Sequence, residues 1–369
     1  MTTAATLPAA ATTVVSRLEV ENFRNLASLL LLPSPTGLTV IQGDNGAGKT
    51  SLLEALVYCS VLRSFRGVPK EAVIRTGADH ATVRCELHFA TRRVEIDVEI
   101  LAGRRDRAER NRQRIEGSRQ LLEVLRTTLF TPDDLELAKG SPVLRRDLLD
   151  DVIAATRPRL GAERVNLDRI LRQRNALLRQ LGGRLDASAA ATLDVWDERL
   201  AETGERVAAS RAELTADLVP LARDAFAALA PGAGMLELSY ARSYAGPLAG
   251  ALAAARDDDL RRQLTTVGPQ RDDLEIVAGG LDARTRLSQG RQRCVALALR
   301  LATHRHVTSV TGVTPVLLLD DAFSELDEAT ARALVNELPS TQALLTTAGA
   351  LPPGAAPDLV VRLAGGKLS

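Results

Sequence analysis

The sequence predicts an α/β protein in which two separated segments build one mixed sheet, with a mainly helical lobe inserted between them. Three observations lead to this prediction. A glycine-rich loop at 43–50 joins an apolar strand to a helix. Apolar and polar residues alternate at 81–90 and 94–100, which is typical of half-buried antiparallel strands. A helical pattern dominates from about 118 to 265, and short apolar strands return after it.

The individual elements follow from local patterns. In the first segment we expect strands at 17–23 and 38–43 and a helix with an apolar face at 52–62, followed by the two alternating strands. Leucine spacing predicts two long helices in the lobe, at 160–180 and 189–229, which Gly182–Gly183 and Pro231–Gly232 punctuate. The second segment should contain, in order, a strand at 273–279, a helix from Ser288, a strand at 316–320, a helix from about Asp327, and strands at 343–347 and 359–363.

Because both segments are needed for one sheet, they should fold together as one head. We therefore expect a disordered tail at 1–14, the first part of the head at 15–125, the helical lobe at 126–264 and the second part of the head at 265–369.

Composition excludes several classes of protein. The 47 basic and 46 acidic residues give a net charge of +1, so overall charge does not indicate constitutive binding to nucleic acid or membranes. The N-terminal residues lack the basic start and long apolar centre of a signal peptide, and no apolar run is long enough to span a membrane. Three cysteines without metal-ligand spacing fit a reducing compartment. We expect a soluble, cytoplasmic protein.

The loop at 43–50 reads GxxxxGKT, the pattern of a phosphate-binding loop. Its glycines let backbone N–H groups and the helix N-terminus face phosphates. Lys49 should reach the β- and γ-phosphates of ATP and assist hydrolysis, and the Thr50 hydroxyl should ligate Mg²⁺. The predicted ATP-binding residues of this segment are Gly43, Asp44, Asn45, Gly46, Ala47, Gly48, Lys49, Thr50 and Ser51.

A second motif follows the apolar strand at 316–320. A strand that is apolar throughout is central in its sheet, and its C-terminal end opens toward the ligand. Asp320 is placed there to hold Mg²⁺, and Asp321 to polarise the attacking water. Alone, this pattern is also that of a strand followed by a helix-capping acid; together with the loop at 43–50 it indicates nucleotide hydrolysis.

A third motif, Leu287–Gln292, opens a helical segment, so that Ser288 can cap the helix and help to form an anion site. It resembles the ABC signature, with Ser288, Gln289, Gly290 and Gln292 as the matching residues. Ser324 and Asp327 resemble the D-loop of that superfamily. The resemblance implies an ABC-type P-loop ATPase head with an antiparallel β subdomain. It also implies that the signature of one protomer covers the γ-phosphate bound by another, so that ATP drives formation of a homodimer. Ser288 would then act in hydrolysis in trans.

Seven further blocks extend the resemblance to nearly the whole chain. They make the sequence similar to the RecF family of bacterial recombination mediators, and they occur at 22–25, 63–66, 131–133, 145–150, 172–175, 268–274 and 319–327. Arg24, in the first block, joins the expected ATP-binding residues. The family resemblance implies an ATPase with slow hydrolysis and no nuclease activity, which binds DNA in gap repair and replication restart. RecR, RecO and RecA would be its functional partners, and it would contribute to SOS induction.

The sequence departs from the superfamily pattern at three places. Gln289 stands where the ABC consensus has glycine, and the strand that usually ends near a switch histidine ends in Thr346-Thr347. No clear counterpart of the γ-phosphate glutamine occurs at 128–131. These departures leave nucleotide binding intact and leave the rate of hydrolysis open.

Two arginine-rich stretches could contact DNA. Residues 102–119 carry seven Arg and three acids, and residues 157–184 carry eight Arg and two acids. Such clusters neutralise phosphates without reading sequence, and the aromatic content of 3% offers few platforms for single strands, so duplex contact is favoured. The family resemblance implies that this duplex lies near single-strand gaps. We place Arg110, Arg112 and Arg114 on a hairpin at a sheet edge that contributes to duplex binding. Ordinary solvated faces of an arginine-rich protein are the alternative for both stretches.

The sequence disfavours three other functions. An ATPase subunit of a transporter is disfavoured by the 239 residues between Lys49 and Ser288. A nuclease-associated ABC protein of the overcoming-lysogenization-defect type needs a nuclease domain, for which the segment of about 40 residues after Asp327 leaves no room. A non-catalytic scaffold does not require Lys49, Thr50, Asp320 and Asp321 all to be present.

Overall fold

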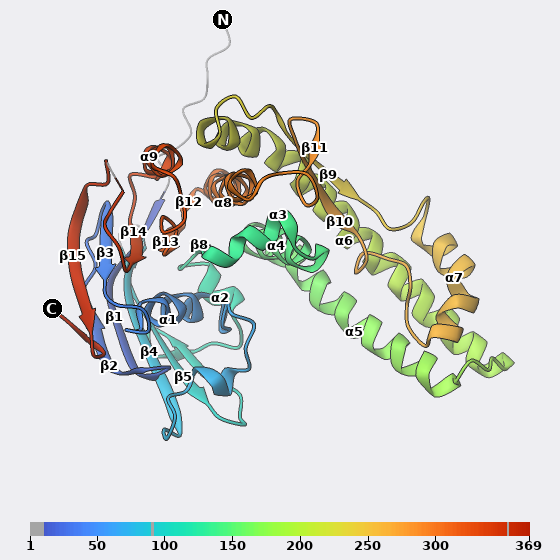
Figure 1. The fold of residues 1–369 in the computed structure, drawn as a ribbon. Coiled ribbons are helices and arrows are strands. Elements are labelled where there is room, and N and C mark those ends of the chain that lie inside the picture. The colour runs from blue at the N-terminus through green and yellow to red at the C-terminus, as the bar shows by residue number, and fades with distance from the viewer. Residues whose placement is uncertain (1–10, 90–91, 353) are drawn as a thin grey trace, which may run out of the picture. The chain divides into compact units, whose positions relative to one another are not determined.

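A computed structural model describes residues 11–89, 92–352 and 354–369 of the chain (Figure 1). It separates into two compact units. The unit that we call the head contains the described residues up to Asp134, together with Ala228–Pro231 and Leu297–Ser369. The unit that we call the lobe contains Leu135–Ala227 and Gly232–Ala296.

The head contains two sheets. The larger one has the order β12-β1-β4-β5-β6-β7, with β2 paired to β1, and it is antiparallel except where β1 meets β12. Its strands are β1 (Ala11–Phe23), β2 (Leu26–Leu31), β4 (His80–Phe89), β5 (Arg92–Leu101), β6 (Arg107–Arg110), β7 (Gln113–Arg114) and β12 (Val313–Thr314). The alternation of buried and less buried residues along β4 and β5 confirms the predicted half-buried strands.

The second sheet places the functional loops. It has the order β16-β15-β3-β14-β13-β8 and is parallel except at β16. Its strands are β3 (Leu38–Gln42), β8 (Thr127–Phe130), β13 (Val316–Asp320), β14 (Ala343–Thr347), β15 (Pro357–Ala364) and β16 (Lys367–Leu368). Every residue of β13 and β14 is buried, as expected for central parallel strands. The carboxyl ends of β3, β13 and β14 therefore meet at one edge.

Helix α1 (Lys49–Val61) lies between the two sheets of the head (Figure 1). We expected one apolar face, but nearly the whole helix is buried, including Glu54 at 0% exposure. The reason is that a helix covered by sheets on both sides has no solvent face. The shorter elements of the head are α2 (Arg119–Leu122), α9 (Glu328–Glu337) and two 3₁₀ turns, at Lys70–Val73 and Pro132–Asp134.

The expected tail at 1–14 lies mostly outside the described residues. Residues 11–14 do not belong to a tail, because they begin β1. Thr13 pairs with Phe89 and Val14 with His88 in the antiparallel ladder, and Thr12 pairs with Thr314. The β-branched residues at 12–15 suit this extended backbone.

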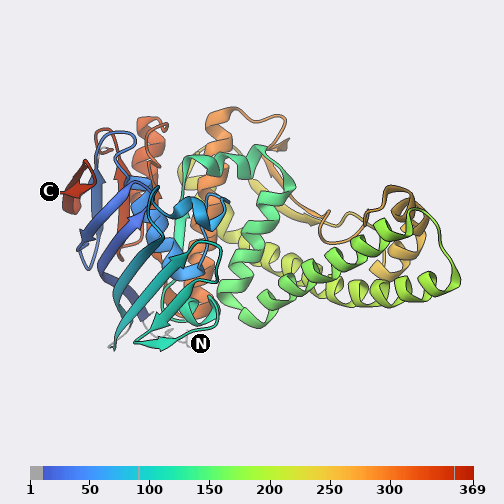
Figure 2. The same cartoon turned by 90° about the horizontal axis from the view of Figure 1, so that it is seen from below.

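The lobe is mainly helical, and α5 and α6 lie side by side (Figures 1 and 2). Its helices are α3 (Leu135–Lys139), α4 (Pro142–Thr156), α5 (Pro158–Leu181), α6 (Ala187–Leu229) and α7 (Leu248–Arg262), and α8 (Gln289–Thr311) begins in it. Gly182 ends α5 with a φ of 56°, as a left-handed C-terminal residue does. Among the helices of the described residues, none is long and apolar enough to cross a membrane.

The boundaries between the units differ from the expected ones. β8, expected in the lobe, pairs with β13 in the parallel sheet of the head. Conversely β10 (Asp273–Ala278), expected in the head, forms a small antiparallel sheet of the lobe with β9 (Leu236–Ala241) and β11 (Leu281–Asp282). A short alternating strand carries no local information about which distant strand it will join.

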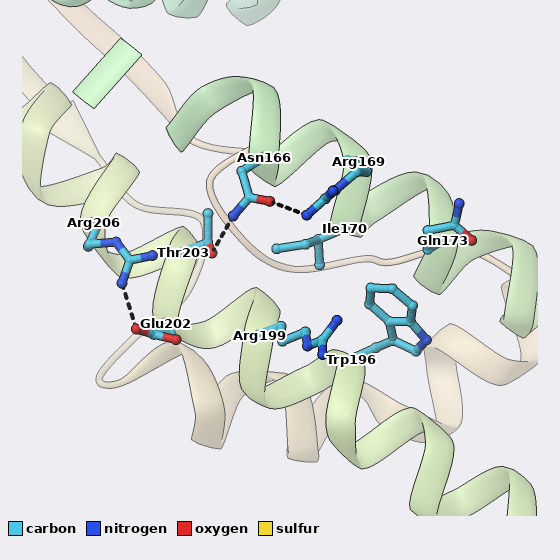
Figure 3. Close-up of a pocket in the computed structure, with 9 residues that line it drawn as sticks. All are labelled: Asn166, Arg169, Ile170, Gln173, Trp196, Arg199, Glu202, Thr203 and Arg206. Atoms are coloured by element: carbon cyan, nitrogen blue, oxygen red, sulfur yellow. Dashed lines mark hydrogen bonds and ion pairs between the residues drawn. The ribbon is translucent and has the colours of Figure 1, made fainter. Parts of the chain in front are cut away.

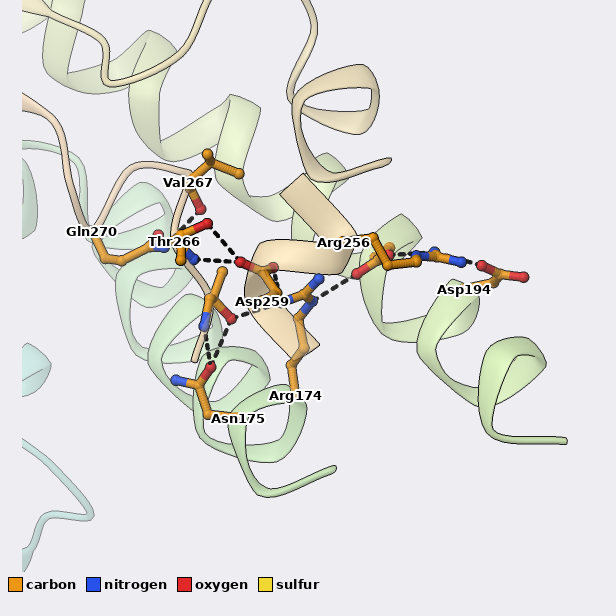
Figure 4. Close-up of polar contacts among 10 residues, drawn as sticks. Arg174, Asn175, Asp194, Arg256, Asp259, Thr266, Val267 and Gln270 are labelled. Atoms are coloured by element: carbon orange, nitrogen blue, oxygen red, sulfur yellow. Dashed lines mark hydrogen bonds and ion pairs between the residues drawn. The ribbon is translucent and has the colours of Figure 1, made fainter. Parts of the chain in front are cut away.

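Buried ion pairs hold the lobe together. Arg174 of α5 is 0% exposed and donates to Asp197 of α6 (2.6 Å) and to Asp259 of α7 (2.7 Å) (Figure 4). Thr265 accepts a further bond of 2.9 Å from the same guanidinium, and Thr265 in turn donates to Asn175 (2.7 Å). Three helices are thus joined through one arginine.

Candidate nucleotide site

The glycine-rich loop runs from the end of β3 into α1. Lys49 is buried, and its Nζ donates to the carbonyl oxygens of Gly43 (2.6 Å) and Asp44 (2.9 Å), so the ammonium lies within the curve of the loop. Gly48 has a φ of 105°, and a Cβ there would lie 2.6 Å from a methyl carbon of Leu26. Only glycine therefore permits both this backbone and this close packing.

Asp320, at the end of β13, lies beside the loop. Its Oδ1 accepts hydrogen bonds from the hydroxyls of Thr50 (2.9 Å) and Thr346 (2.6 Å). Burial raises the pKa of the Asp320 carboxyl above its ordinary value, while these two hydrogen bonds and the charge of Arg66 act in the opposite direction. The structure thus brings together Lys49, Thr50 and Asp320 from two motifs that lie 270 positions apart.

Asp321 begins the turn that follows β13. Its φ is 48°, and its N–H donates to the carbonyl oxygen of Thr346 (3.0 Å). The Ser324 hydroxyl donates to the Asp321 carbonyl oxygen (3.0 Å), and the Asp327 carboxylate accepts from the Thr330 N–H (2.7 Å) at the start of α9. The two D-loop residues therefore fix the turn and the helix start after the second aspartate.

A pocket of about 870 Å³ opens over these groups. Seven of the expected ATP-binding residues line it, namely Arg24, Asn45, Gly46, Gly48, Lys49, Thr50 and Ser51. Asp320 and Asp321 line it as well, whereas Gly43, Asp44 and Ala47 are not among its lining residues. The Gly43 and Asp44 carbonyls instead hold Lys49, as described above.

Arg24 lines the pocket, but its guanidinium has partners of its own. It donates to both carboxylate oxygens of Glu54, at 3.0 and 2.6 Å, and to the carbonyl oxygen of Ala72 (2.8 Å). Ser64 donates to the same carboxylate (2.5 Å), and Arg66 lies 3.5 Å from it. A buried acid on α1 thus holds two arginines at the mouth of the pocket.

Sequence reasoning did not identify four residues of this site. Asn25 donates to the Gly46 carbonyl oxygen (2.8 Å) and accepts from the Ser51 hydroxyl (3.1 Å), so it holds the loop from the side. Glu54 and Arg66 form the charged group described above, and Thr346 positions Asp320. The available signals were weak: a charged residue inside an apolar helix for Glu54, and membership of a recognised block for Asn25 and Arg66.

Comparison with known proteins agrees with this geometry. The family model for the RecF/RecN/SMC N-terminal domain matches residues 14–348. A DNA replication and repair protein RecF from Streptomyces avermitilis is 40% identical over 352 residues, which cover 90% of this chain and 93% of that protein. The RecF of Acidothermus cellulolyticus is 38% identical over 349 residues, with the same two coverages. The chain belongs to the RecF family.

Solved structures extend the comparison. Two structures of the recombination mediator protein RecF in the RecFOR pathway, one with ATPrS and one with ATP, are each 26% identical to this chain, with TM-scores of 0.88 and 0.89. They cover 98% and 99% of this chain, and 99% of each RecF chain is covered. An Smc head domain from Pyrococcus furiosus, at 16% identity and a TM-score of 0.57, shares the fold over 97% of this chain and 95% of its own. The predicted RecF resemblance and the ABC-type head fold are confirmed.

The signature motif of this RecF-family chain lies in the lobe, at the start of α8. Ser288, Gln289 and Gly290 are exposed, and the Ser288 carbonyl oxygen accepts the first helical bond, from Gln292 (2.9 Å). Gln292 differs from the other three, because it is buried and its side chain donates to the carbonyl oxygens of Ala283 (2.9 Å) and Arg284 (3.3 Å). Its amide therefore fixes the loop before the helix, and we do not retain it as a contact to a second protomer.

The arginine hairpin lies at the edge of the larger sheet of the head. β6 and β7 are joined at Asn111 and Arg112, whose φ values of 52° and 63° are those of a tight two-residue hairpin turn. Arg112 and Arg114 are exposed, whereas Arg110 donates to the Gln120 carbonyl oxygen (3.1 Å) and to Glu123 (3.3 Å). The structure confirms the edge hairpin and shows that two of its three arginines, Arg112 and Arg114, are exposed.

Proposed function

We propose that this RecF-family chain binds Mg-ATP in the pocket beside the glycine-rich loop and hydrolyses it slowly at a site that a second copy completes. ATP-driven dimerisation then gates its binding to duplex DNA near single-strand gaps. The observation that carries this proposal is the convergence of Lys49, Thr50 and Asp320, with the Thr50 and Asp320 oxygens 2.9 Å apart.

The oxygens present suit a magnesium ion. Thr50 and Asp320 offer a hydroxyl and a carboxylate, which are hard ligands of the kind that Mg²⁺ takes beside the phosphates of a nucleotide. Bound there, Mg²⁺ would favour the ionised form of the Asp320 carboxyl and would supply positive charge to the phosphate oxygens. Thr346 keeps Asp320 turned toward Thr50, since its hydroxyl donates to the same oxygen at 2.6 Å.

Lys49 and the start of α1 contact the phosphates. The ammonium of Lys49 is held only by the carbonyl oxygens of Gly43 and Asp44, and its charge is not neutralised by a carboxylate of the described chain. Phosphate oxygens can replace those carbonyls with a gain in charge–charge attraction. Asp321 is fixed through its backbone by Thr346, and we assign it the polarisation of the attacking water.

The second protomer supplies the exposed start of α8. Ser288, Gln289 and Gly290 present a hydroxyl and the free N–H groups of a helix N-terminus to solvent, which is a favourable place for an anion. We assign these groups to the γ-phosphate bound by the other copy. Ser324 and Asp327 shape the D-loop of the same interface.

The biological role that we propose follows the RecF relatives. The chain acts in the cytoplasm in recombinational gap repair and replication restart, loads RecA together with RecR and RecO, and contributes to SOS induction. The two RecF structures are described as a recombination mediator of the RecFOR pathway, and the curated relatives as replication and repair proteins, which supports this assignment. No nuclease activity is expected.

The experiment titrates a fluorescently labelled gapped duplex with the protein, with and without Mg-ATP. Fluorescence anisotropy of the duplex measures binding. We expect Mg-ATP to tighten DNA binding by the parent chain at least about tenfold. DNA binding by the Lys49→Ala variant should not change with Mg-ATP. Lys139→Ala, which changes an exposed lysine in the lobe, is the control. Binding that is equally tight without nucleotide would contradict the proposal.

A further inference from the structure

The lobe contains a second pocket, formed between α5 and α6 (Figure 3). Its volume is about 620 Å³. The α5 wall consists of Asn166, Arg169, Ile170 and Gln173, and the α6 wall consists of Trp196, Arg199, Glu202, Thr203 and Arg206. None of these residues belongs to the nucleotide site, so the pocket needs an explanation of its own.

The pocket is a groove that follows both helices. The α5 residues are spaced i, i+3, i+4 and i+7, so they form one stripe along one face of that helix. Trp196 and Arg206 bound the α6 side, ten positions apart, which corresponds to roughly 15 Å of helix. An extended peptide rises roughly 3.3 Å per residue, so the groove accommodates about four or five residues.

The charges in the groove are unequal along its length. At one end Arg206 is neutralised, because it donates to Glu202 (2.7 Å) and to Glu163 (3.1 Å). Arg169 and Arg199 have no carboxylate partner among the described residues of the chain. Arg169 donates to the Asn166 side-chain oxygen (3.1 Å), and the Arg199 guanidinium lies 5.4 Å from the centre of the Trp196 ring.

These two arginines contrast with the buried arginines of the same lobe. Arg174 and Arg211 are each held by carboxylates, with hydrogen bonds of 2.6 to 2.8 Å. A guanidinium carries five N–H donors, and Arg169 uses one of them on Asn166, so both groups keep donors for an anionic group. The groove therefore favours a ligand that carries a negative charge near its middle.

The other walls of the groove indicate a peptide. Ile170 is 3% exposed and lies with the half-buried Trp196 ring on an apolar part of the wall, which suits an aromatic or large aliphatic side chain. The side-chain amides of Asn166 and Gln173 can bond peptide groups.

Nucleic acid fits the same groove less well. The exposed face of α6 at this level carries Asp194, Glu198 and Glu202, of which Asp194 is paired with Arg256 and Glu202 with Arg206. A phosphate backbone that follows the helix would therefore find few free arginines and would meet the Glu198 carboxylate. A short peptide with a single acidic side chain at Arg169 and Arg199 avoids that carboxylate.

We propose that the groove between α5 and α6 is a docking site for an acidic peptide segment of a partner protein. A carboxylate of the peptide binds Arg169 and Arg199, and a neighbouring aromatic side chain packs on Trp196 and Ile170. This inference is independent of the nucleotide chemistry proposed above, since it concerns residues of the lobe alone.

Trp196 is the single tryptophan of the chain and reports on the groove directly. The probe is a capped pentapeptide with one aspartate beside one phenylalanine and neutral residues elsewhere, titrated without nucleotide and followed by tryptophan emission. We expect a saturable change in emission, because a carboxylate on Arg199 alters the contact between its guanidinium and the indole ring. A peptide with lysine in place of the aspartate should give no response.

Three variants make the test specific. Arg169→Glu and Arg199→Glu should each weaken peptide binding by about tenfold or more, because each turns a charge-assisted hydrogen bond into a repulsion. Arg172→Glu, an exposed change on α5 outside the groove, is the matched control and should stay within about twofold. All three should keep the melting temperature and the ATP affinity of the parent chain, which separates failure here from failure of the proposed function.

The outcomes that would overturn the proposal are definite. They are an unchanged emission at millimolar peptide, an equal response to the lysine peptide, or a response that the two groove variants leave intact. A saturable response to oligothymidylate without one to the acidic peptide would also overturn it, and would assign the groove to nucleic acid.

Discussion

Lys49 and Asp320 of the head and Arg174 of the lobe are all buried charged side chains, but the groups that contact them differ. In the head, Lys49 is held by two backbone carbonyls, and Asp320 by two threonine hydroxyls. In the lobe, Arg174 lies between two carboxylates, those of Asp197 and Asp259. A buried charge whose partners are neutral can still bind a charged ligand. A buried charge that is paired with an opposite charge instead stabilises the contact between the elements that carry the pair. The chemistry of the nearest partners thus separates the binding site from the structural cluster.

The largest effect should come from breaking the ion pairs of the lobe. Arg174→Ala leaves Asp259 without its cation, and Asp259 is 0% exposed, whereas Asp197 keeps its pair with Arg256. We expect a loss of about 3–5 kcal/mol in the free energy of unfolding of the lobe. Urea unfolding measures it. Arg332→Ala, which breaks an exposed pair with Glu328, is the control and should change stability by less than about 1 kcal/mol. Equal losses of stability in Arg174→Ala and Arg332→Ala would contradict the structural role assigned to Arg174.

His304 of α8 sharpens the contrast, because its partner is also neutral. Its Nδ1 lies 3.0 Å from the Thr128 hydroxyl, and burial lowers the pKa of His304 from 6.5 to about 4. The unfolded chain takes up a proton below pH 6.5 and the folded chain does not until about pH 4. The free energy of unfolding should therefore fall by up to about 3 kcal/mol as the pH falls through this range.

The His304→Gln variant isolates that contribution. Its stability should fall less steeply between pH 6.5 and 4 than that of the parent chain, when both are measured by chemical unfolding at each pH. Parallel pH profiles would show that His304 can be protonated in the folded state.

Lys49→Ala tests the head side of the comparison. Because the partners of Lys49 are neutral carbonyls, its removal leaves no buried charge unpaired, and stability should change little. ATP affinity should fall on the order of 100-fold, since charge-assisted bonds to the phosphates are lost. Calorimetric titration with Mg-ATP measures the loss. A strongly destabilised variant would mean that Lys49 serves the fold rather than the ligand.

The smallest effect should come from the hairpin of β6 and β7. Its exposed arginines are held neither by buried carbonyls and hydroxyls, as in the nucleotide site, nor by buried carboxylates, as in the lobe. Arg112→Ala and Arg114→Ala should each reduce the slope of log affinity against log salt for duplex DNA by about 1. Arg110→Ala should have a smaller effect, because Arg110 already contacts Glu123. Arg261→Ala, an exposed lobe arginine paired with Asp258, is the control. An unchanged slope in all the hairpin variants would remove the hairpin from the DNA interface.

The sequence predicted those parts of the fold and the site that local patterns encode. The bounds of β13, β14, α5 and α6 agree with the expected ranges within a few residues, since leucine spacing and apolar runs act locally. The pairing of β9 with β10 was not predicted, because pairing depends on strands far apart in the chain.

The same reasoning applies to the charged residues. Lys49, Thr50 and Asp320 lie in short motifs, whereas Thr346 contacts Asp320 only because β13 and β14 are neighbours. The net charge of the stretch 157–184 overstates the positive charge available at the surface. Arg164 is paired with Asp150 of α4 and Asp168 of α5, and Arg174 is paired with Asp197 and Asp259. The RQRN block at 172–175 likewise contains the arginine that joins three helices.

The most direct test of the central claim is the molar mass in solution of an Asp321→Asn variant, measured by light scattering with and without Mg-ATP. If Ser288 of a second copy completes the nucleotide site, the chain should be a monomer without nucleotide and a dimer with it. Adding Ser288→Arg should leave ATP bound and keep the chain monomeric. A monomer in both conditions with ATP demonstrably bound, or a dimer that Ser288→Arg does not disrupt, would contradict the shared site.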